Sequence, residues 1–113
     1  MKQFGFLLLI CLANISYAQS TEKVKAVKAY YSGFERNDWN TVAAQFADGF
    51  TFTSPNNDDH ISVEKFKEKC FVTARFVKKV NFIKMMESGN DLMLLVEIIS
   101  TDNKIVHNVD VYK

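Results

Sequence analysis

Apolar side chains recur every three or four residues along three stretches of the chain, and this period predicts three helices. The first stretch ends at Asn37, and its apolar stripe consists of Val24, Val27, Tyr31 and Phe34. The second covers residues 39–46, and Asp38 stands where a residue that caps the helix start is expected. The third follows Ser62, another capping residue, and its stripe runs over residues 63–74.

Other apolar runs have the features of strands. Residues 50–53 alternate apolar and polar positions, as a half-buried strand does. A polar stretch at residues 54–60 predicts a loop, and residues 77–86 and 105–112 predict strands. Residues 92–99 form a nearly continuous apolar run, which predicts a central strand covered on both faces. Because helices come first and strands follow across short turns, we expect an α+β fold with a mostly antiparallel sheet.

The first eighteen residues have the pattern of a secretory signal peptide. Lys2 is followed by an apolar core at residues 4–15, and small side chains at Ser16 and Ala18 precede the expected cut. The apolar core is shorter than the roughly 20 residues that span a bilayer. We therefore expect cleavage near Ala18, export of residues 19–113 to the periplasm or medium, and no stable membrane insertion afterwards. An uncleaved membrane anchor is the alternative.

Charge and cysteine content narrow the possible partners. Lys2 is the only charged residue in the expected signal, so 13 of the 14 basic residues remain beside all 13 acidic ones. A balanced chain without a basic run argues against a nucleic-acid or membrane-surface partner. Cys70 would be the only cysteine left, which excludes an internal disulfide, and its place on the third stripe favours buried packing.

The order of elements and several local motifs resemble the nuclear transport factor 2-like superfamily, and within it the SnoaL-like group. The motifs are the aromatic pair Tyr30 and Tyr31 before an Asp-capped helix, a Phe-Ala-Asp turn at residues 46–48, a strand ending near Pro55, and the tail at residues 108–113. The resemblance covers residues 22–113. It implies three N-terminal helices on a curved sheet that forms a cone, an apolar pocket at the mouth of the cone, and a homodimer through the outer face of the sheet. It also implies one further strand, which this chain would lack.

The resemblance also suggests which residues surround the pocket. Within the superfamily, ketosteroid isomerase uses a carboxylate base, and a phenol and a neutral carboxylic acid that donate to the enolate oxygen. Alignment places Tyr30 at the phenol and Asp110 at the acid, whereas the base position holds Ser54, which cannot shuttle protons at ordinary pH. A small apolar ligand would then be surrounded by Tyr30, Trp39, Phe52, Ser54, Phe66, Asp110 and Tyr112.

The orientation of the last strand is open at this point. Plain alternation would bury Ile105, His107, Val109 and Val111 and leave Asp110 in water. The resemblance implies the opposite, with Asp110 and Tyr112 on the pocket side.

These observations support one leading hypothesis and two alternatives. The leading one is an exported SnoaL-like domain without catalysis that binds a small apolar molecule or acts as a dimerisation module. An isomerase- or cyclase-type enzyme would use Tyr30 and Asp110 as oxyanion donors and His60 or Asp59 as a relocated base. The simpler and favoured interpretation of His60 and Asp59 is a solvated polar loop. A structural interaction domain without a ligand is the third. We expect no cofactor and no metal site, because Asp58, Asp59 and His60 are adjacent rather than spaced as ligands.

Overall fold

The computed structural model describes residues 22–113, and the expected signal peptide lies outside the described residues. A long helix over residues 22–35 comes first, and we refer to it as the long helix. The elements after it are α2 (Trp39–Ala43), β1 (Phe52–Ser54), β2 (Asp58–Ile61), α3 (Val63–Lys69), the 3-10 helix η1 (Phe71–Phe76), β3 (Val77–Ser88), β4 (Asp91–Ser100) and β5 (Ile105–Tyr112). The predicted α+β class with antiparallel strands is confirmed.

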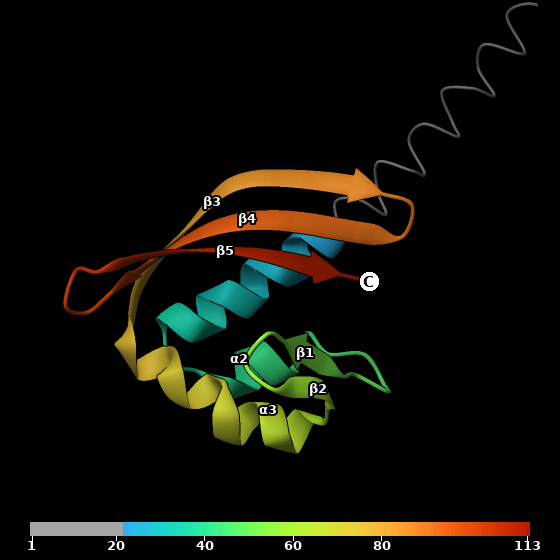
Figure 1. The fold of residues 1–113 in the computed structure, drawn as a ribbon, viewed down its shortest axis with the longest axis horizontal. Helices are drawn as coiled ribbons and strands as arrows, with labels where there is room; N and C mark the ends of the chain where they lie inside the picture. The colour runs from blue at the N-terminus through green and yellow to red at the C-terminus, as the bar shows by residue number, and fades with distance from the viewer. Residues whose placement is uncertain (1–21) are drawn as a thin grey trace, which may run out of the picture.

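The fold has a sheet packed on the long helix and a smaller lobe beside them. Strands β3, β4 and β5 form the sheet in that order, with β4 in the centre. The long helix lies against one face of this sheet, and α2, the β1–β2 hairpin and α3 lie together on the other side of the helix (Figure 1). We call these last elements the lobe. Two apolar cores follow from this arrangement. One lies between helix and sheet, and the other, the lobe core, is shared by the lobe, η1 and the end of the long helix.

The central strand is covered on one face only within residues 22–113. Leu92, Leu94 and Val96 are almost fully buried against Val27 and Tyr31 of the long helix. Residues that alternate with them, such as Met93 and Leu95, are only half-buried. The expectation of cover on both faces is therefore wrong, because the helices pack on one side of the sheet.

The register of β5 decides which of its side chains face the helix. Asp110 pairs with Leu94 and Tyr112 with Leu92, so both lie on the covered face. Val109 lies on the opposite face and is 72% exposed. The expectation from plain alternation is thus wrong. The apolar residues of β5 face outward, and Asp110 is stabilised inside by side-chain hydrogen bonds.

The long helix ends in a compact turn that leads directly into α2. Asn37 adopts a left-handed conformation (φ 53°), its N–H donates to the Phe34 carbonyl at 3.2 Å, and the Asp38 N–H donates to the Gly33 carbonyl at 2.8 Å. This pattern is a Schellman C-cap. The Asp38 carboxylate then accepts a hydrogen bond from the Thr41 N–H, so the predicted cap of the second helix is confirmed.

Two contacts hold the long helix in place at this end. A Cβ built on Gly33 would lie 2.5 Å from Val42 Cγ2, so only glycine lets α2 approach the helix this closely. On the other side, Glu35 Oε1 accepts a hydrogen bond from the Val80 N–H of β3 at 2.8 Å.

Several boundaries differ from the sequence prediction. The second helix ends at Ala43 rather than residue 46, and the third changes from α3 to η1 at Cys70. Ser62 caps α3 as predicted, by accepting from the Lys65 N–H. The stretch at residues 54–60 is not a plain loop, because its second half forms β2 and pairs with β1.

Candidate functional site

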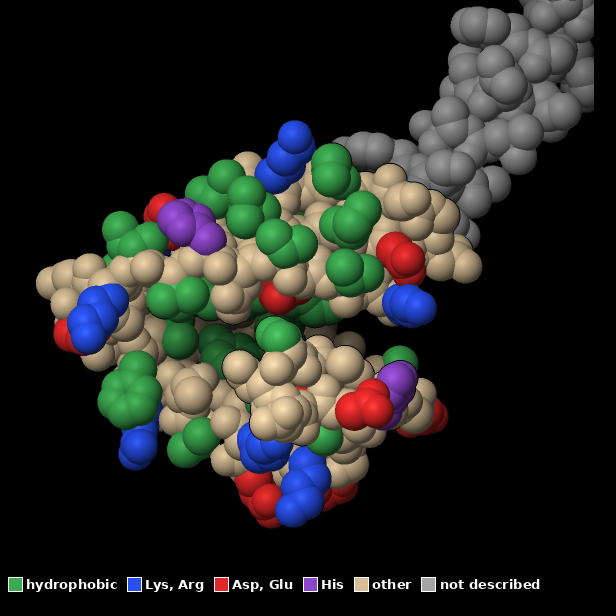
Figure 2. Space-filling model, viewed as in Figure 1, with side chains coloured by type: hydrophobic (Ala, Val, Ile, Leu, Met, Phe, Trp, Pro, Cys, Tyr) green, Lys and Arg blue, Asp and Glu red, His purple; other side chains and the backbone are tan. Residues whose placement is uncertain are grey.

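The candidate site is a hollow between the sheet and the lobe. Figure 2 shows the surface hollowed at this place, with hydrophobic side chains inside it. Several aromatic side chains of the two cores are only half-buried, although aromatic rings are usually covered more completely: Tyr30, Trp39, Phe46, Phe50, Phe52 and Tyr112. A concave apolar surface with a few polar groups is the usual form of a small-molecule site.

Three polar side chains meet on the wall formed by the sheet and the long helix. The hydroxyls of Tyr31 and Tyr112 both donate to Oδ2 of Asp110, the second at 3.0 Å. Asp110 is half-buried, and Tyr31 is buried. The family resemblance implied that Tyr30 would be the phenol beside Asp110, whereas in the structure the hydrogen bond to Asp110 comes from Tyr31.

Tyr30 lies beside this group and joins the two aromatic cores. Its ring centroid is 5.0 Å from that of Tyr31 and 6.1 Å from that of Tyr112, and it also approaches Phe46 and Phe66 of the lobe. Its hydroxyl makes no hydrogen bond within the described residues. Because every fully buried polar side-chain atom there has a partner, this hydroxyl is not completely buried, although burial of the residue is large enough to raise its pKa. Of the three tyrosine hydroxyls in this group, that of Tyr30 is the one without a partner in residues 22–113.

The three tyrosines are held in their neutral form. Burial raises the pKa of Tyr30, Tyr31 and Tyr112 well above the ordinary phenol value, and the nearby Asp110 carboxylate raises each further. At physiological pH all three are hydrogen-bond donors rather than bases.

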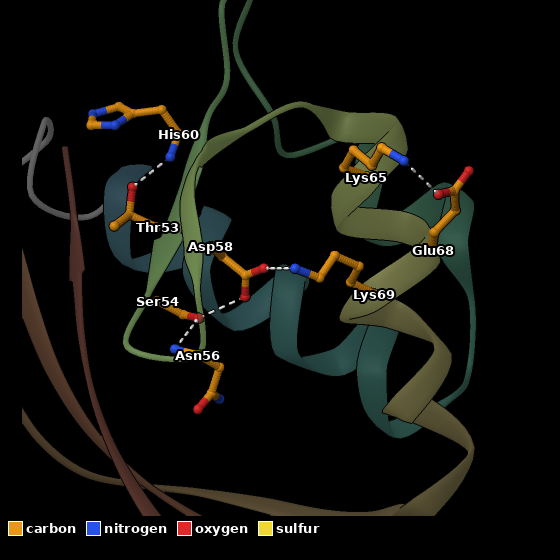
Figure 3. A network of polar contacts seen from close by, with 8 residues as sticks. All are labelled: Thr53, Ser54, Asn56, Asp58, His60, Lys65, Glu68 and Lys69. Atoms are coloured by element: carbon orange, nitrogen blue, oxygen red, sulfur yellow. Dashed lines mark hydrogen bonds and ion pairs between the residues drawn. The ribbon is translucent and has the colours of Figure 1, made fainter.

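The predicted pocket residue Ser54 belongs to a separate polar network in the lobe (Figure 3). Ser54 Oγ donates to Asp58 Oδ2 at 2.7 Å, and the Lys69 ammonium forms an ion pair with Asp58 Oδ1. Asp58 is only 6% exposed. These hydrogen bonds, first to Lys69 and then to Ser54, lower the pKa of the Asp58 carboxyl. The network ties the β1–β2 hairpin to α3.

The two candidates for a relocated base are exposed. His60 and Asp59 contact each other, and their side chains are 74% and 85% exposed. Figure 3 shows the His60 ring pointing away from the Asp58–Lys69 pair. Within the described residues no contact joins either side chain to Tyr30 or Asp110, so the structure does not bring the acid–base candidates together.

The remaining predicted pocket residues surround Phe66 in the lobe. Phe66 is 1% exposed, and its ring is 4.9 Å from Phe52 and 6.3 Å from Trp39 between centroids. Phe66 is thus a core residue, and Phe52 and Trp39 are half-buried side chains that pack against the same core. Cys70, predicted to be buried, is half-buried at the edge of the same core.

Sequence reasoning missed the roles of Tyr31 and Asp58. Tyr31 was placed on the apolar stripe, although a buried hydroxyl there needed a partner across the fold. Asp58 was assigned to a solvated loop. The turn residues Pro55, Asn56 and Asn57 carried the signal that could have corrected this, because they are typical of a tight turn between strands.

Acidification tests the role of the Asp58 network. Because the folded pKa of Asp58 lies below its unfolded value, the stabilisation is complete above the ordinary aspartate pKa of about 3.9 and is lost as pH falls through the folded pKa. We expect Asp58→Asn to reduce the loss of unfolding free energy seen in urea titrations below about pH 4. The exposed neighbour provides the control, since Asp59→Asn should leave this loss unchanged. An equal pH profile for parent and Asp58→Asn would contradict the prediction.

Residues 22–113 were also compared with the patterns of metal-ligand clusters and of membrane-spanning helices. No three His, Cys, Asp or Glu side chains in this part of the chain gather as metal ligands. No helix in the same part is long and apolar enough to cross a bilayer.

Comparisons with known proteins found no matching family model, no matching curated protein and no matching solved structure.

Proposed function

We propose that the chain is an exported SnoaL-like domain, built as a nuclear transport factor 2-like cone, that binds a small apolar molecule without chemical change. The observation that carries the proposal is the hollow between sheet and lobe. The two cores on either side of it contribute half-buried aromatic rings, the unpaired hydroxyl of Tyr30 and the hydrogen-bonded group around Asp110. Such a surface stabilises an apolar ligand by burial, and the few polar groups orient it.

Binding is better supported than an isomerase- or cyclase-type reaction. A proton-shuttling base must reach the substrate at hydrogen-bond distance. Ser54 is engaged with Asp58, and the exposed pair of Asp59 and His60 makes no contact with the Asp110 group in the described part of the chain. Tyr31 and Tyr112 already donate their protons to Asp110, so they are not poised to donate to an enolate oxygen.

A neutral apolar dye tests the binding proposal. We expect Nile red fluorescence to report saturable binding to the folded domain, because the dye transfers from water to the aromatic hollow. Tyr112→Ala should weaken this binding roughly three- to tenfold, the equivalent of one aromatic contact. Val109→Ala on the outer face is the matched control and should have no effect. Binding that is absent, or unchanged by Tyr112→Ala in a variant that still unfolds cooperatively, would count against the hollow as the site.

The outer face of the sheet supports a second role, as a homodimer interface. Hydrophobic side chains gather on the face of the sheet turned to the viewer in Figure 2. Within residues 22–113 the exposed ones include Met86, Ile105, Val109 and Val111. A shallow depression of about 190 Å³ lies among Lys84, Met86, Met93, Leu95 and Val109. Exposed apolar patches of this kind are typical of interaction sites.

Sedimentation measures the proposed dimer directly. We expect a concentration-dependent monomer–dimer equilibrium, and Val109→Lys should raise its dissociation constant at least about tenfold because it places a charge in the apolar face. Val72→Lys adds the same charge at an exposed valine of η1 and serves as the control. A monomer at all concentrations would exclude the dimer while leaving the ligand proposal intact.

A further inference from the structure

The hydrogen bonds among Tyr31, Tyr112 and Asp110 determine which atoms are left to donate to or accept from a ligand. Both phenol protons, from Tyr31 and Tyr112, are donated to one oxygen of Asp110, Oδ2. The other oxygen, Oδ1, receives no hydrogen bond within the described residues. Since no fully buried polar side-chain atom there lacks a partner, Oδ1 is not completely buried. What this group offers a ligand is therefore an acceptor.

Asp110 also carries a charge that no neighbouring cation balances. Within residues 22–113 it forms no ion pair with a lysine, arginine or histidine, whereas Asp58, the acidic side chain of the lobe core, is paired with Lys69. Two lysines of the long helix have other contacts. Lys23 donates to the Asn90 carbonyl at 2.6 Å, and Lys28 lies over the Phe82 ring at 5.9 Å.

Aromatic side chains lie next to this carboxylate. Tyr30 packs edge-on against both Tyr31 and Tyr112, the two side chains that donate to Asp110. The negative faces of such rings attract cations, and a carboxylate adds a direct charge-assisted hydrogen bond to an ammonium. An anionic oxygen would meet a like charge, and a neutral carbonyl oxygen would find no free donor on Tyr31 or Tyr112.

We infer that the ligand of the hollow is a small amphiphilic amine, with its ammonium at Asp110 Oδ1 and its apolar body among the aromatic side chains of the lobe. This inference rests on the proposed function and names its ligand class. The site would thus accept hydrogen bonds from a cation, whereas an oxyanion site donates hydrogen bonds to a negative oxygen. The Tyr30 hydroxyl, which has no hydrogen-bond partner within the described residues, can accept a second hydrogen bond from the same ammonium.

Three probes of equal length separate charge from apolar burial. Protonated hexylamine, neutral hexanol and anionic hexanoate are titrated into the full chain at pH 7 and followed by backbone NMR shifts. We expect hexylamine to bind roughly five- to tenfold more tightly than hexanol, the sum of a part-exposed ion pair and a cation–π contact. Hexanoate should bind more weakly than hexanol. The largest shifts should lie at residues 30–31 and 110–112.

Two variants locate the charge effect. Asp110→Asn keeps the size and an acceptor for Tyr31 but removes the charge, so it should abolish the preference for hexylamine over hexanol. Glu97→Gln removes a carboxylate from the outer face, where Glu97 contacts His107 at 3.3 Å, and should keep the preference.

The outcomes distinguish this inference from the proposed function. Equal binding of hexylamine and hexanol in the hollow, or a preference that survives Asp110→Asn, overturns the amine assignment and leaves the apolar site standing. Shifts confined to the depression around Val109 overturn the assignment of the site. No binding by any of the three probes overturns both proposals.

Discussion

Phe66→Ala is expected to lower the free energy of unfolding by about 3–5 kcal/mol, the usual cost of removing a buried phenylalanine. Phe66 is 1% exposed and stands at the centre of the lobe core. Its ring is within 6.3 Å of six other aromatic rings, those of Tyr30, Phe34, Trp39, Phe46, Phe50 and Phe52. The cavity left by alanine cannot collapse easily, because the six surrounding rings belong to parts of the chain other than α3.

Urea denaturation followed by tryptophan fluorescence measures this effect, since Trp39 lies in the same core. Phe76→Ala makes the same chemical change at a ring that is 51% exposed, and we expect it to cost less than about 1 kcal/mol. A domain of this size has roughly 5–15 kcal/mol of stability in total, so we expect the Phe66 variant to unfold at a much lower urea concentration than the parent. Equal midpoints for the two variants would show that the lobe core is not packed as described.

Gly33→Ala is expected to destabilise the domain by about 1–3 kcal/mol, even though alanine favours helix formation by about 1 kcal/mol. The added methyl group would lie 2.5 Å from Val42 Cγ2, 3.0 Å from the Val42 nitrogen and 3.1 Å from the Asp38 carbonyl oxygen. Valine is stiff at χ1, and the other two atoms belong to the backbone. The long helix and α2 must therefore separate to make room.

A double-mutant cycle identifies the clash. Val42→Ala removes the nearest atom, so the cost of Gly33→Ala should be smaller in a Val42→Ala background than in the parent. The rescue should be partial, because the two backbone contacts remain. Additive costs would mean that the helices do not meet at Gly33.

The local features of the fold could be predicted because they depend on neighbouring residues. The caps Asp38 and Ser62 accept from the residue three positions on, which sequence shows directly. The stripe of Val27, Tyr31 and Phe34 is buried as its period predicts. The early ends of α2 and α3 could not be predicted in the same way, because packing inside the lobe decides where each helix stops.

The candidate site depended on contacts that sequence does not show. Alternation on the last strand favoured burial of its valines, yet the pairing of Leu94 with Asp110 places the carboxylate inside. A phenol 79 positions away makes this arrangement stable, and no local pattern reports such a partner. The resemblance suggested the correct face for Asp110 but the wrong tyrosine. Tyr30 and Tyr31 are adjacent, and a turn of about 100° along the helix separates the directions of their side chains.

The position of Tyr30 has a consequence for how the molecule unfolds. Tyr30 and Val77 are the two half-buried side chains that pack against both apolar cores in the described part of the chain. Few side chains are thus shared between the two cores, and we expect hydrogen exchange to show the lobe opening as a cooperative unit of its own. A molecule held in the hollow would touch both cores. Binding of that molecule would slow the local opening of the lobe. The local stability of the lobe would therefore rise with ligand concentration.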